Sequence, residues 1–307
     1  MILIADSGST KVDWKAIRQN GEVVSVSTEG LNPVFVSKEF IVNVLKEKLV
    51  PFVGEGVKEV YFYGAGVVSP EHIKTISDAM GEAFPGSVCY AASDLLAAAR
   101  ALCGHNPGIA CIMGTGGNTC FYDGENIVKN IKAGGFILGD EGSGGNLGKR
   151  LVSDFIKGLL PKHIEAEFVK RYDLDYMKIV DRVYKQPMPN RFRASFCPFI
   201  NEFRDDSHIK SIVMDCFRDF FRRNISHYDY SRYPVNLVGS VAYYFADYLN
   251  EAAAEFGATI GKILKSPIDG LVEYHRSLKW FNYNISKIFQ DENNRTIIKL
   301  LDRKSVV

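Results

Sequence analysis

Two turns rich in glycine and hydroxyl residues each follow a short apolar strand, and turns of this kind can bind a phosphate. The first follows the apolar run 2–5 and reads Asp6-Ser-Gly-Ser-Thr-Lys11. Its backbone N–H groups, its hydroxyls and a lysine beside a carboxylate suit a phosphate and its metal ion. The same residues are also common in plain hairpins, because glycine adopts positive φ and Asp and Ser bond their own backbone. Taken alone, the first turn leaves both interpretations open.

The chain repeats this arrangement once. The second turn follows the apolar run 108–113 and reads Gly114-Thr-Gly-Gly-Asn118. In each copy the chain returns as a strand, and a tight-turn signal, Asn20-Gly21 or Asp123-Gly124, then leads into a third strand. Such a repeat indicates internal duplication. The sequence therefore predicts two similar α/β lobes that each present one hairpin to a shared cleft.

A third motif, Gly139-Asp-Glu-Gly-Ser-Gly144, makes a family likeness specific. With these three motifs the chain resembles the N-acetylglucosamine kinase branch of the actin, hexokinase and heat-shock ATPase superfamily, which also contains the BadF/BadG/BcrA/BcrD ATPases. The likeness covers residues 1–276, motif by motif rather than evenly. It implies an α/β fold of two duplicated ribonuclease H-like lobes, each with a mixed five-stranded sheet and flanking helices, and a cleft between the lobes.

The resemblance also implies how the chain is divided. Residues 1–107 are expected to form the first actin-like lobe. Residues 108–276 are expected to form the second, with a helical insertion at 160–230 and a last helix that returns to the first lobe. The composition changes after this point, so we assign no role to the tail 277–307.

ATP and Mg²⁺ are the cofactors that the resemblance implies. Asp6 is expected to hold Mg²⁺ through water. A Gly-Ser step after the apolar run 235–238 stands where the superfamily packs adenosine on two small residues, and Ser240 is a mild departure from that pattern. The residues expected to bind the nucleotide are Ser7, Gly8, Ser9, Thr10, Lys11, Gly114, Thr115, Gly116, Gly239 and Ser240.

Asp94 is the candidate catalytic base. It follows the predicted strand 87–91 and starts a strong helix, where either Ser93 or Asp94 could act as the cap. Phosphoryl transfer to an alcohol needs a carboxylate that accepts the hydroxyl proton. In the family that the chain resembles, the aspartate at this strand-to-helix step has that role.

The acceptor implied by the resemblance is a sugar, first of all N-acetylglucosamine, phosphorylated on its primary hydroxyl. The residues expected to contact it are Asn32, Gly64, Asp94, Gly117, Asn118, Gly134, Gly135 and Asp140. Asn32 before a proline is equally typical of a plain turn. The residues alone do not separate N-acetylglucosamine from N-acetylmuramic acid, N-acetylmannosamine or glucose.

One tempting motif fails. Gly148-Lys149 resembles the end of a Walker A loop, but Ser143 and Arg150 stand where that loop needs glycine and Ser or Thr. The chain 160–230 mixes arginines with aromatics, and its many acids favour amphipathic helices over a surface for single-stranded nucleic acid.

Composition narrows the partners. The net charge is +1, which gives no general attraction to nucleic acid or to an anionic membrane. The six cysteines are scattered without a C-x₂-C pair, so neither a zinc site nor a disulfide framework is expected. No apolar run reaches the length of a membrane span, and a cytoplasmic location is the default expectation. A homodimer is expected only by analogy with fold relatives.

Two other functions remain open at this point. The first is the ATPase that activates a radical dehydratase or a reductase, which carries an iron–sulfur cluster on cysteines at a subunit interface; the unpatterned cysteines here count against it. The second is a non-catalytic module that binds ATP and a sugar and regulates a partner. Such a module could dispense with the base, so the presence of Asp94 counts against it.

Overall fold

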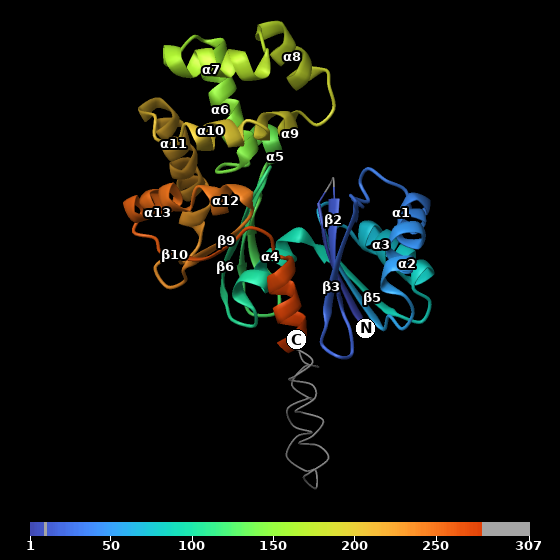
Figure 1. The fold of residues 1–307 in the computed structure, drawn as a ribbon. Coiled ribbons are helices and arrows are strands. Elements are labelled where there is room, and N and C mark those ends of the chain that lie inside the picture. Colours follow the sequence, from blue (N-terminus) through green and yellow to red (C-terminus); the bar gives the residue numbers. More distant parts are fainter. Residues whose placement is uncertain (9–10, 278–307) are drawn as a thin grey trace.

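Two five-stranded sheets organise the chain in the computed structural model, which describes residues 1–8 and 11–277 (Figure 1). The first sheet has the order β3-β2-β1-β4-β5, and the second has the order β10-β9-β6-β7-β8. The strands of the first are β1 (Ile2–Ser7), β2 (Lys11–Ile17), β3 (Val23–Glu29), β4 (Glu59–Gly64) and β5 (Val88–Ser93). The strands of the second are β6 (Gly108–Met113), β7 (Gly117–Tyr122), β8 (Ile127–Ile131), β9 (Val235–Val238) and β10 (Ile260–Leu264).

The two sheets have the same pairing pattern, which confirms the predicted duplication and fold class. β1 pairs antiparallel with β2 and parallel with β4, just as β6 pairs antiparallel with β7 and parallel with β9. Parallel strands carry their carboxyl ends to one edge, where ligands of α/β sheets bind. In both lobes that edge lies beside the glycine-rich turn after the first strand of the copy.

One face of the first sheet packs on helices of its own lobe. These are α1 (Lys38–Val44), a π-helical turn (Leu45–Leu49), α2 (Val50–Val53) and α3 (Pro70–Ala83). Ser37 and Ser69 cap α1 and α3 by accepting a backbone N–H with their side chains. Leu3, Ala5 and Phe62 point from β1 and β4 into this core. Alternate residues of the same strands therefore face the other way, towards the second lobe.

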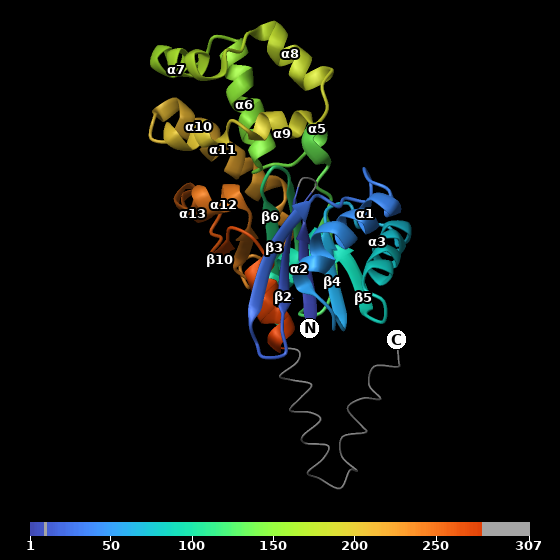
Figure 2. The same cartoon turned by 45° about the vertical axis from the view of Figure 1, so that its right-hand side comes forward.

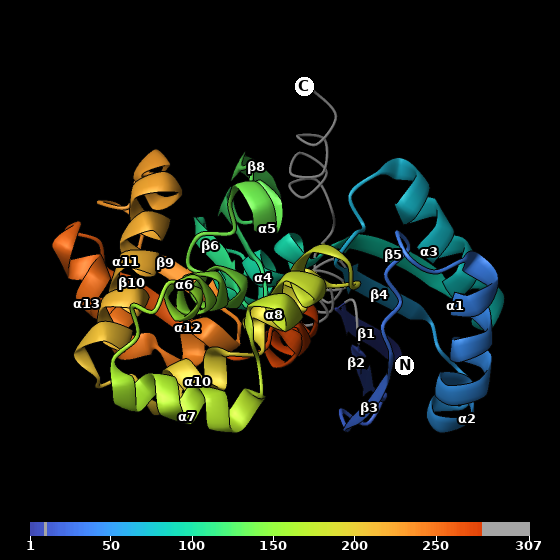
Figure 3. The same cartoon turned by 90° about the horizontal axis from the view of Figure 1, so that it is seen from above.

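Two helices lie between the sheets and join the lobes. α4 (Asp94–Cys103) turns Leu95 and Ala98 onto β6 and β7, while Ala97 packs with residues of β1. The helix 268–277 follows β10, and its Leu271 packs with Ile2 of β1. Figure 3, seen from above, shows α4 between the sheet of the first lobe and that of the second.

A helical layer covers the end of the second sheet where β6 enters its turn (Figure 2). Its helices are α5 (Gly135–Leu138), α6 (Gly144–Ile156), α7 (Lys162–Tyr172), α8 (Tyr176–Tyr184), α9 (Pro189–Ala194), α10 (Cys197–Glu202) and α11 (Ser207–Arg223). α12 (Ser240–Tyr244) and α13 (Ala246–Glu255) follow β9. The core here is largely aromatic, as Phe168, Phe199 and Phe217 illustrate. No helix among residues 1–8 and 11–277 is long and apolar enough to cross a membrane.

Candidate active site

At the carboxyl edge of the first sheet, the ends of three strands that lead into the predicted site lie side by side. Ser7 of β1, Gly64 of β4 and Ser93 of β5 are direct partners across the sheet. A side chain at position 64 would put its Cβ 3.3 Å from the Ser7 Cβ and 2.7 Å from the Phe62 ring. Gly64 therefore lets the strands pack closely at this edge. Asp94 comes directly after Ser93 and is the first residue of α4.

Ser93, and not Asp94, caps α4. The Ser93 side chain accepts a hydrogen bond from the Leu96 N–H at 3.3 Å. The Asp94 carboxylate instead accepts from the backbone N–H groups of Leu95 and of Asp94 itself. These bonds fix the carboxylate at the helix N-terminus, while burial raises its pKa above the ordinary value. The capping role that the sequence left open for Asp94 thus belongs to its neighbour.

Asp6 and Asp94 are close enough for their charges to repel. Burial raises the pKa of Asp6 to about 7, and the nearby charges of Asp94 and then Asp13 add to the rise. Lys11 and a hydrogen bond from the Ser266 side chain oppose it. A divalent cation would relieve this repulsion, so the two carboxylates fit Mg²⁺. Within residues 1–8 and 11–277 no cluster of three or more His, Cys, Asp or Glu surrounds a metal position, so a Mg²⁺ ion here would take most of its ligands from water and phosphate.

The first glycine turn is described only in part. Gly8 donates its N–H to the Lys11 carbonyl at 3.0 Å. Lys11 pairs with Asp13 at 2.8 Å, and its side chain is well exposed. Two of the predicted phosphate ligands, Ser9 and Thr10, lie outside the described residues.

The second glycine turn is packed tightly against α6 and β9. Gly114 and Thr115 accept hydrogen bonds through their carbonyls from the N–H groups of Gly144 and Gly145, at 2.8 and 2.9 Å. The N-terminal end of α6 therefore holds the turn in place. On its other side the turn meets Gly239, whose N–H donates to the Leu264 carbonyl at 2.9 Å.

Only glycine fits at position 239, because of its backbone conformation and its close neighbours. Its φ is +133°, and a Cβ there would stand 2.3 Å from the Met113 carbonyl oxygen and 3.0 Å from the Gly114 nitrogen. The Gly239-Ser240 step therefore lies directly against the second turn. One predicted adenosine residue, Gly239, thus lies next to one predicted phosphate residue, Gly114.

We expect Gly239→Ala to cost on the order of 3 kcal/mol of unfolding free energy and to weaken Mg·ATP binding at least about tenfold, because backbone atoms cannot yield to the new methyl group. Gly257→Ala is the matched control, since Gly257 also has a positive φ, of +65°, but has nothing within 4 Å of its Cβ position. The control should lose only about 1–2 kcal/mol and bind ATP normally. Urea unfolding and calorimetric titration measure both quantities. Equal losses in the two variants would contradict the close contact as the cause.

Asp140 connects the glycine loop to the second turn. It accepts the Gly117 N–H with its side chain, and a Cβ on Gly116 would stand 3.2 Å from its Oδ2. Burial raises the pKa of Asp140, and Glu141 adds to the rise. Asp140 has a φ of 56°, an unusual value for a residue other than glycine. Such strain is typical of functional loops.

Three of the predicted sugar residues of the second lobe line one depression, which is too small in this structure to hold even a water molecule. Gly117, Asn118 and Asp140 line it together with Glu141 and Asn224. Gly134 and Gly135 both have positive φ, which lets the chain double back so that Asp140 donates its N–H to the Ala133 carbonyl at 2.9 Å. The loop 133–140 is therefore a closed turn beside this depression.

Asn32 lies in the first lobe near the carboxyl edge of β4. Its Oδ1 accepts the Val34 N–H at 3.0 Å, as in an Asx turn. A Cβ on Gly66 would stand 2.3 Å from the same oxygen. The turn interpretation of Asn32 is thus correct locally, and the turn places the residue next to the 64–66 loop.

Ser266 is a contact that the sequence did not predict. Its side chain bonds the Asp6 carboxylate, two residues after Leu264 has accepted the Gly239 N–H. One short segment therefore touches both the metal candidate and the adenosine step. The Ser266 Oγ also lies 3.5 Å from the Ile268 nitrogen, at the start of the helix 268–277.

Arg193 is the second unpredicted residue. Its Nη2 donates to the Phe136 carbonyl at 2.9 Å, and its guanidinium lies 5.1 Å from the centre of the Phe136 ring. The side chain is buried, and its charge acts on Asp140. Arg193 thus anchors the 133–140 loop to α9 through its contacts with Phe136. A basic residue among aromatics was the only sequence signal, and that signal is common on amphipathic helices.

Comparison with known structures places the chain in a family. A Porphyromonas gingivalis protein provisionally named an N-acetylglucosamine kinase is 39% identical, with a TM-score of 0.86; the match covers 90% of this chain and 99% of that one. The chain belongs to the N-acetylglucosamine kinase-like family. This confirms the resemblance inferred from the three motifs. No protein-family model and no curated protein matches this N-acetylglucosamine kinase-like chain.

More distant structures share the fold of the N-acetylglucosamine kinase-like chain. A Chromobacterium violaceum protein, also provisionally named an N-acetylglucosamine kinase, is 15% identical with a TM-score of 0.69 and covers 89% of this chain and 98% of its own. A glucokinase of the ROK family from Streptomyces griseus, solved with glucose and AMPPNP, is 16% identical with a TM-score of 0.55 and covers 89% and 97%. At these identities the likeness concerns the fold alone.

Proposed function

We propose that this protein is an ATP-dependent kinase that transfers the γ-phosphoryl group to the primary hydroxyl of an amino sugar, giving N-acetylglucosamine 6-phosphate from N-acetylglucosamine. The observation that carries the proposal is the placement of Asp94. Its carboxylate accepts two backbone N–H groups at the sheet edge, close to Asp6, while Ser93 supplies the cap of α4.

Asp6 is the residue that would hold Mg²⁺ in the proposed reaction, and Ser266 would orient it. The metal would neutralise charge on the phosphates. The turns 7–11 and 114–118 would donate backbone N–H groups to the phosphates, and Gly239-Ser240 would let adenosine approach the backbone. The location of Gly239 against Met113 and Gly114 supports one nucleotide surface in the second lobe.

The proposed reaction is an in-line transfer. The sugar hydroxyl oxygen forms a bond to the γ-phosphorus, the bond from that phosphorus to the bridging oxygen of ADP breaks, and the hydroxyl proton passes to Asp94. A raised pKa strengthens Asp94 as a proton acceptor. Closure of the two lobes would exclude water from the phosphoryl group.

The acetamido sugar is supported by the provisional name of the Porphyromonas gingivalis relative, which is 39% identical. Two carboxylates and two carboxamides, from Asn118, Asp140, Glu141 and Asn224, meet beside Asp140, and this region would have to open to admit a sugar ring. Carboxylates and carboxamides together can pair with the alternating donors of a sugar. The positions of the cysteines give no support to the activator ATPase, because none of the six is exposed as a cluster at a subunit interface would need: Cys111, Cys120 and Cys216 are buried and the other three are partly buried.

We expect Arg193→Lys to raise KM for the sugar about tenfold and to leave KM for ATP within about twofold, because lysine cannot both bond the Phe136 carbonyl and lie over its ring. Arg191→Lys is the matched control on the same helix, since Arg191 is exposed. Steady-state kinetics with each substrate varied in turn give both constants. A rise in KM for ATP instead would contradict a role confined to the 133–140 loop.

The proposed function is tested by ADP release with Mg·ATP and a panel of N-acetylglucosamine, N-acetylmannosamine, N-acetylmuramic acid and glucose, beside a control without sugar. We expect release that depends on sugar and is fastest with N-acetylglucosamine. Release that ignores every sugar would favour an activator ATPase, and ATP binding without release would favour a regulatory module. A homodimer and a cytoplasmic location stay predictions, which sedimentation and cell fractionation test.

A further inference from the structure

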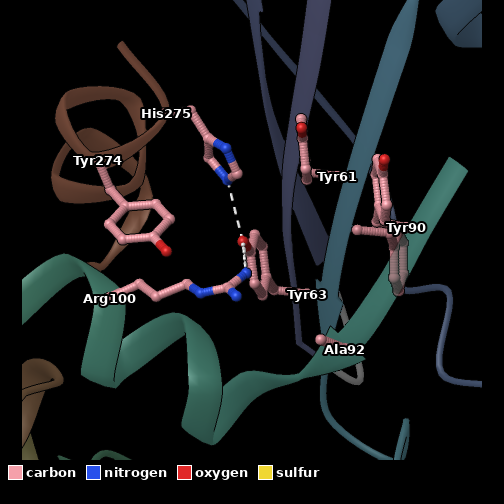
Figure 4. Close-up of a pocket in the computed structure, with 8 residues that line it drawn as sticks. Tyr61, Tyr63, Tyr90, Ala92, Arg100, Tyr274 and His275 are labelled. Atoms are coloured by element: carbon pink, nitrogen blue, oxygen red, sulfur yellow. Dashed lines mark hydrogen bonds between the residues drawn. The ribbon is translucent and has the colours of Figure 1, made fainter. Parts of the chain in front are cut away.

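A cavity of about 280 Å³ lies in the first lobe, away from the predicted site residues, none of which lines it. Strands β4 and β5 form its floor, and α4 and the helix 268–277 form its side (Figure 4). Its wall is mostly aromatic, with Tyr61, Tyr63, Tyr90 and Tyr274. Nothing in the proposed kinase reaction uses these side chains.

The cation in this wall is Arg100, and its partners are neutral. Its Nη1 donates to the Tyr63 hydroxyl at 2.7 Å, and its guanidinium lies 5.1 Å from the centre of the Tyr274 ring. The Tyr63 oxygen is 2.9 Å from Nε2 of His275. Burial lowers the pKa of His275 to about 3 and raises the pKa of Tyr63, so both are uncharged at neutral pH.

Arg100 therefore carries an uncompensated charge. Among residues 1–8 and 11–277 no carboxylate lies within ion-pair distance of it, and its Nε is buried without a hydrogen-bond partner. A half-buried guanidinium without an anion is unusual, because buried charges are normally paired. An anion that enters the cavity would supply the missing partner, and a planar guanidinium matches a carboxylate well.

The aromatic part of the wall offers a stacking surface. The Tyr61 and Tyr90 rings stack with centres 4.9 Å apart and planes 8° apart. Tyr90 is half exposed, and Ala92 next to it on β5 contributes only a methyl group (Figure 4). The Tyr61 ring also meets the His275 ring, with centres 3.9 Å apart, so a flat ligand ring would lie against the exposed Tyr90 in offset stacking. A cavity of 150 Å³ can hold benzene, so about 280 Å³ accommodates one substituted ring.

We propose that this cavity is a binding site for a small aromatic monocarboxylate, with the carboxylate on Arg100 and the ring on the tyrosine wall. The single cation sets the charge of the ligand at one. A phosphate monoester carries close to two negative charges at neutral pH, and one of them would stay unpaired in the cavity. No residue that lines this cavity is a predicted contact of ATP or of the sugar.

Calorimetric titration of the full chain with phenylacetate tests the proposal. Phenylacetamide has the same shape without the charge, and cyclohexylacetate has the same charge without the aromatic ring. We expect saturable binding of phenylacetate, at least about tenfold weaker binding of phenylacetamide and a smaller loss for cyclohexylacetate. No saturable binding of phenylacetate below about 10 mM would overturn the proposal.

Variants place the binding. Arg100→Gln should weaken the binding of phenylacetate at least about tenfold. Tyr90→Ser should also weaken this binding, and we expect it to leave the stability of the fold unchanged because Tyr90 is half exposed. Arg232→Gln is the matched control, because it removes an exposed guanidinium 5.1 Å from the Tyr233 ring in the other lobe. Unchanged affinity in both Arg100→Gln and Tyr90→Ser would overturn the assignment. Binding of glucose 6-phosphate that depends on Arg100, without binding of phenylacetate, would also overturn the assignment.

Discussion

Asp94→Asn should lower kcat by about 10²–10⁴-fold while the affinity for Mg·ATP stays within about threefold. The substitution keeps the shape of the side chain and removes its ability to accept a proton. Ser93 remains in place to cap α4, so the helix start should survive. ATP is expected to contact the hairpin turns and the Gly239 step, and none of these depends on the charge of Asp94. Steady-state rates and calorimetric titration of AMPPNP measure the two effects.

The control for this variant is Asp13→Asn. Asp13 is another carboxylate close to Asp6, but it lies on β2 and pairs with Lys11 at 2.8 Å. We expect this control to change kcat by less than about threefold. An unchanged rate in Asp94→Asn would remove Asp94 from its role as base, whatever the control does.

Asp6→Asn should abolish phosphoryl transfer and, at the same time, make the metal-free protein more stable above pH 7. The pKa of Asp6 is raised to about 7 in the folded protein, chiefly by burial, against an ordinary value of 3.8. A raised carboxyl pKa means that the folded state holds the proton more tightly than the unfolded chain. The ionised group therefore destabilises the fold, by an amount that grows from about pH 4 and is complete above about pH 7.

The expected gain of Asp6→Asn in the unfolding free energy is on the order of 2–4 kcal/mol at pH 8 and close to zero at pH 4. Thermal unfolding in EDTA at the two pH values measures it. Mg²⁺ should stabilise the wild-type protein more than the variant, because only the wild type offers the carboxylate. A variant that is less stable than the wild type at pH 8 in EDTA would contradict the repulsion between Asp6 and Asp94.

The parts of this fold that could be predicted from sequence are those that local chemistry decides. Alternation of apolar residues and glycine turns identified the meander 2–29 and its copy 108–131, and their similarity implied two lobes with the same sheet order. The strand ends then placed Gly64 and Asp94 at one edge, because parallel strands carry their carboxyl ends to the same side. The family resemblance, rather than turn chemistry, pointed to Gly239, whose surroundings leave no room for a Cβ.

The parts that could not be predicted depend on segments far apart in the chain. Ser266 reaches Asp6 only because β10 and the next helix pass between the lobes, and nothing near Ser266 in the sequence signals this. Tyr63 and His275 are hydrogen-bonded across 212 residues. The sequence around Arg193 is typical of the exposed charged face of a helix, whereas in the structure its side chain bonds the 133–140 loop. Tertiary packing decides such contacts, and a single sequence does not contain them.

The central claim is transfer of the γ-phosphoryl group to a sugar hydroxyl rather than to water, and proton-coupled ³¹P NMR of the reaction tests it most directly. The wild-type protein with Mg·ATP and N-acetylglucosamine should produce ADP and a phosphomonoester whose resonance is split into a triplet by the two methylene protons at carbon 6. Asp94→Asn should give almost none of this product in the same time. Inorganic phosphate as the only new resonance, with or without sugar, would contradict the account.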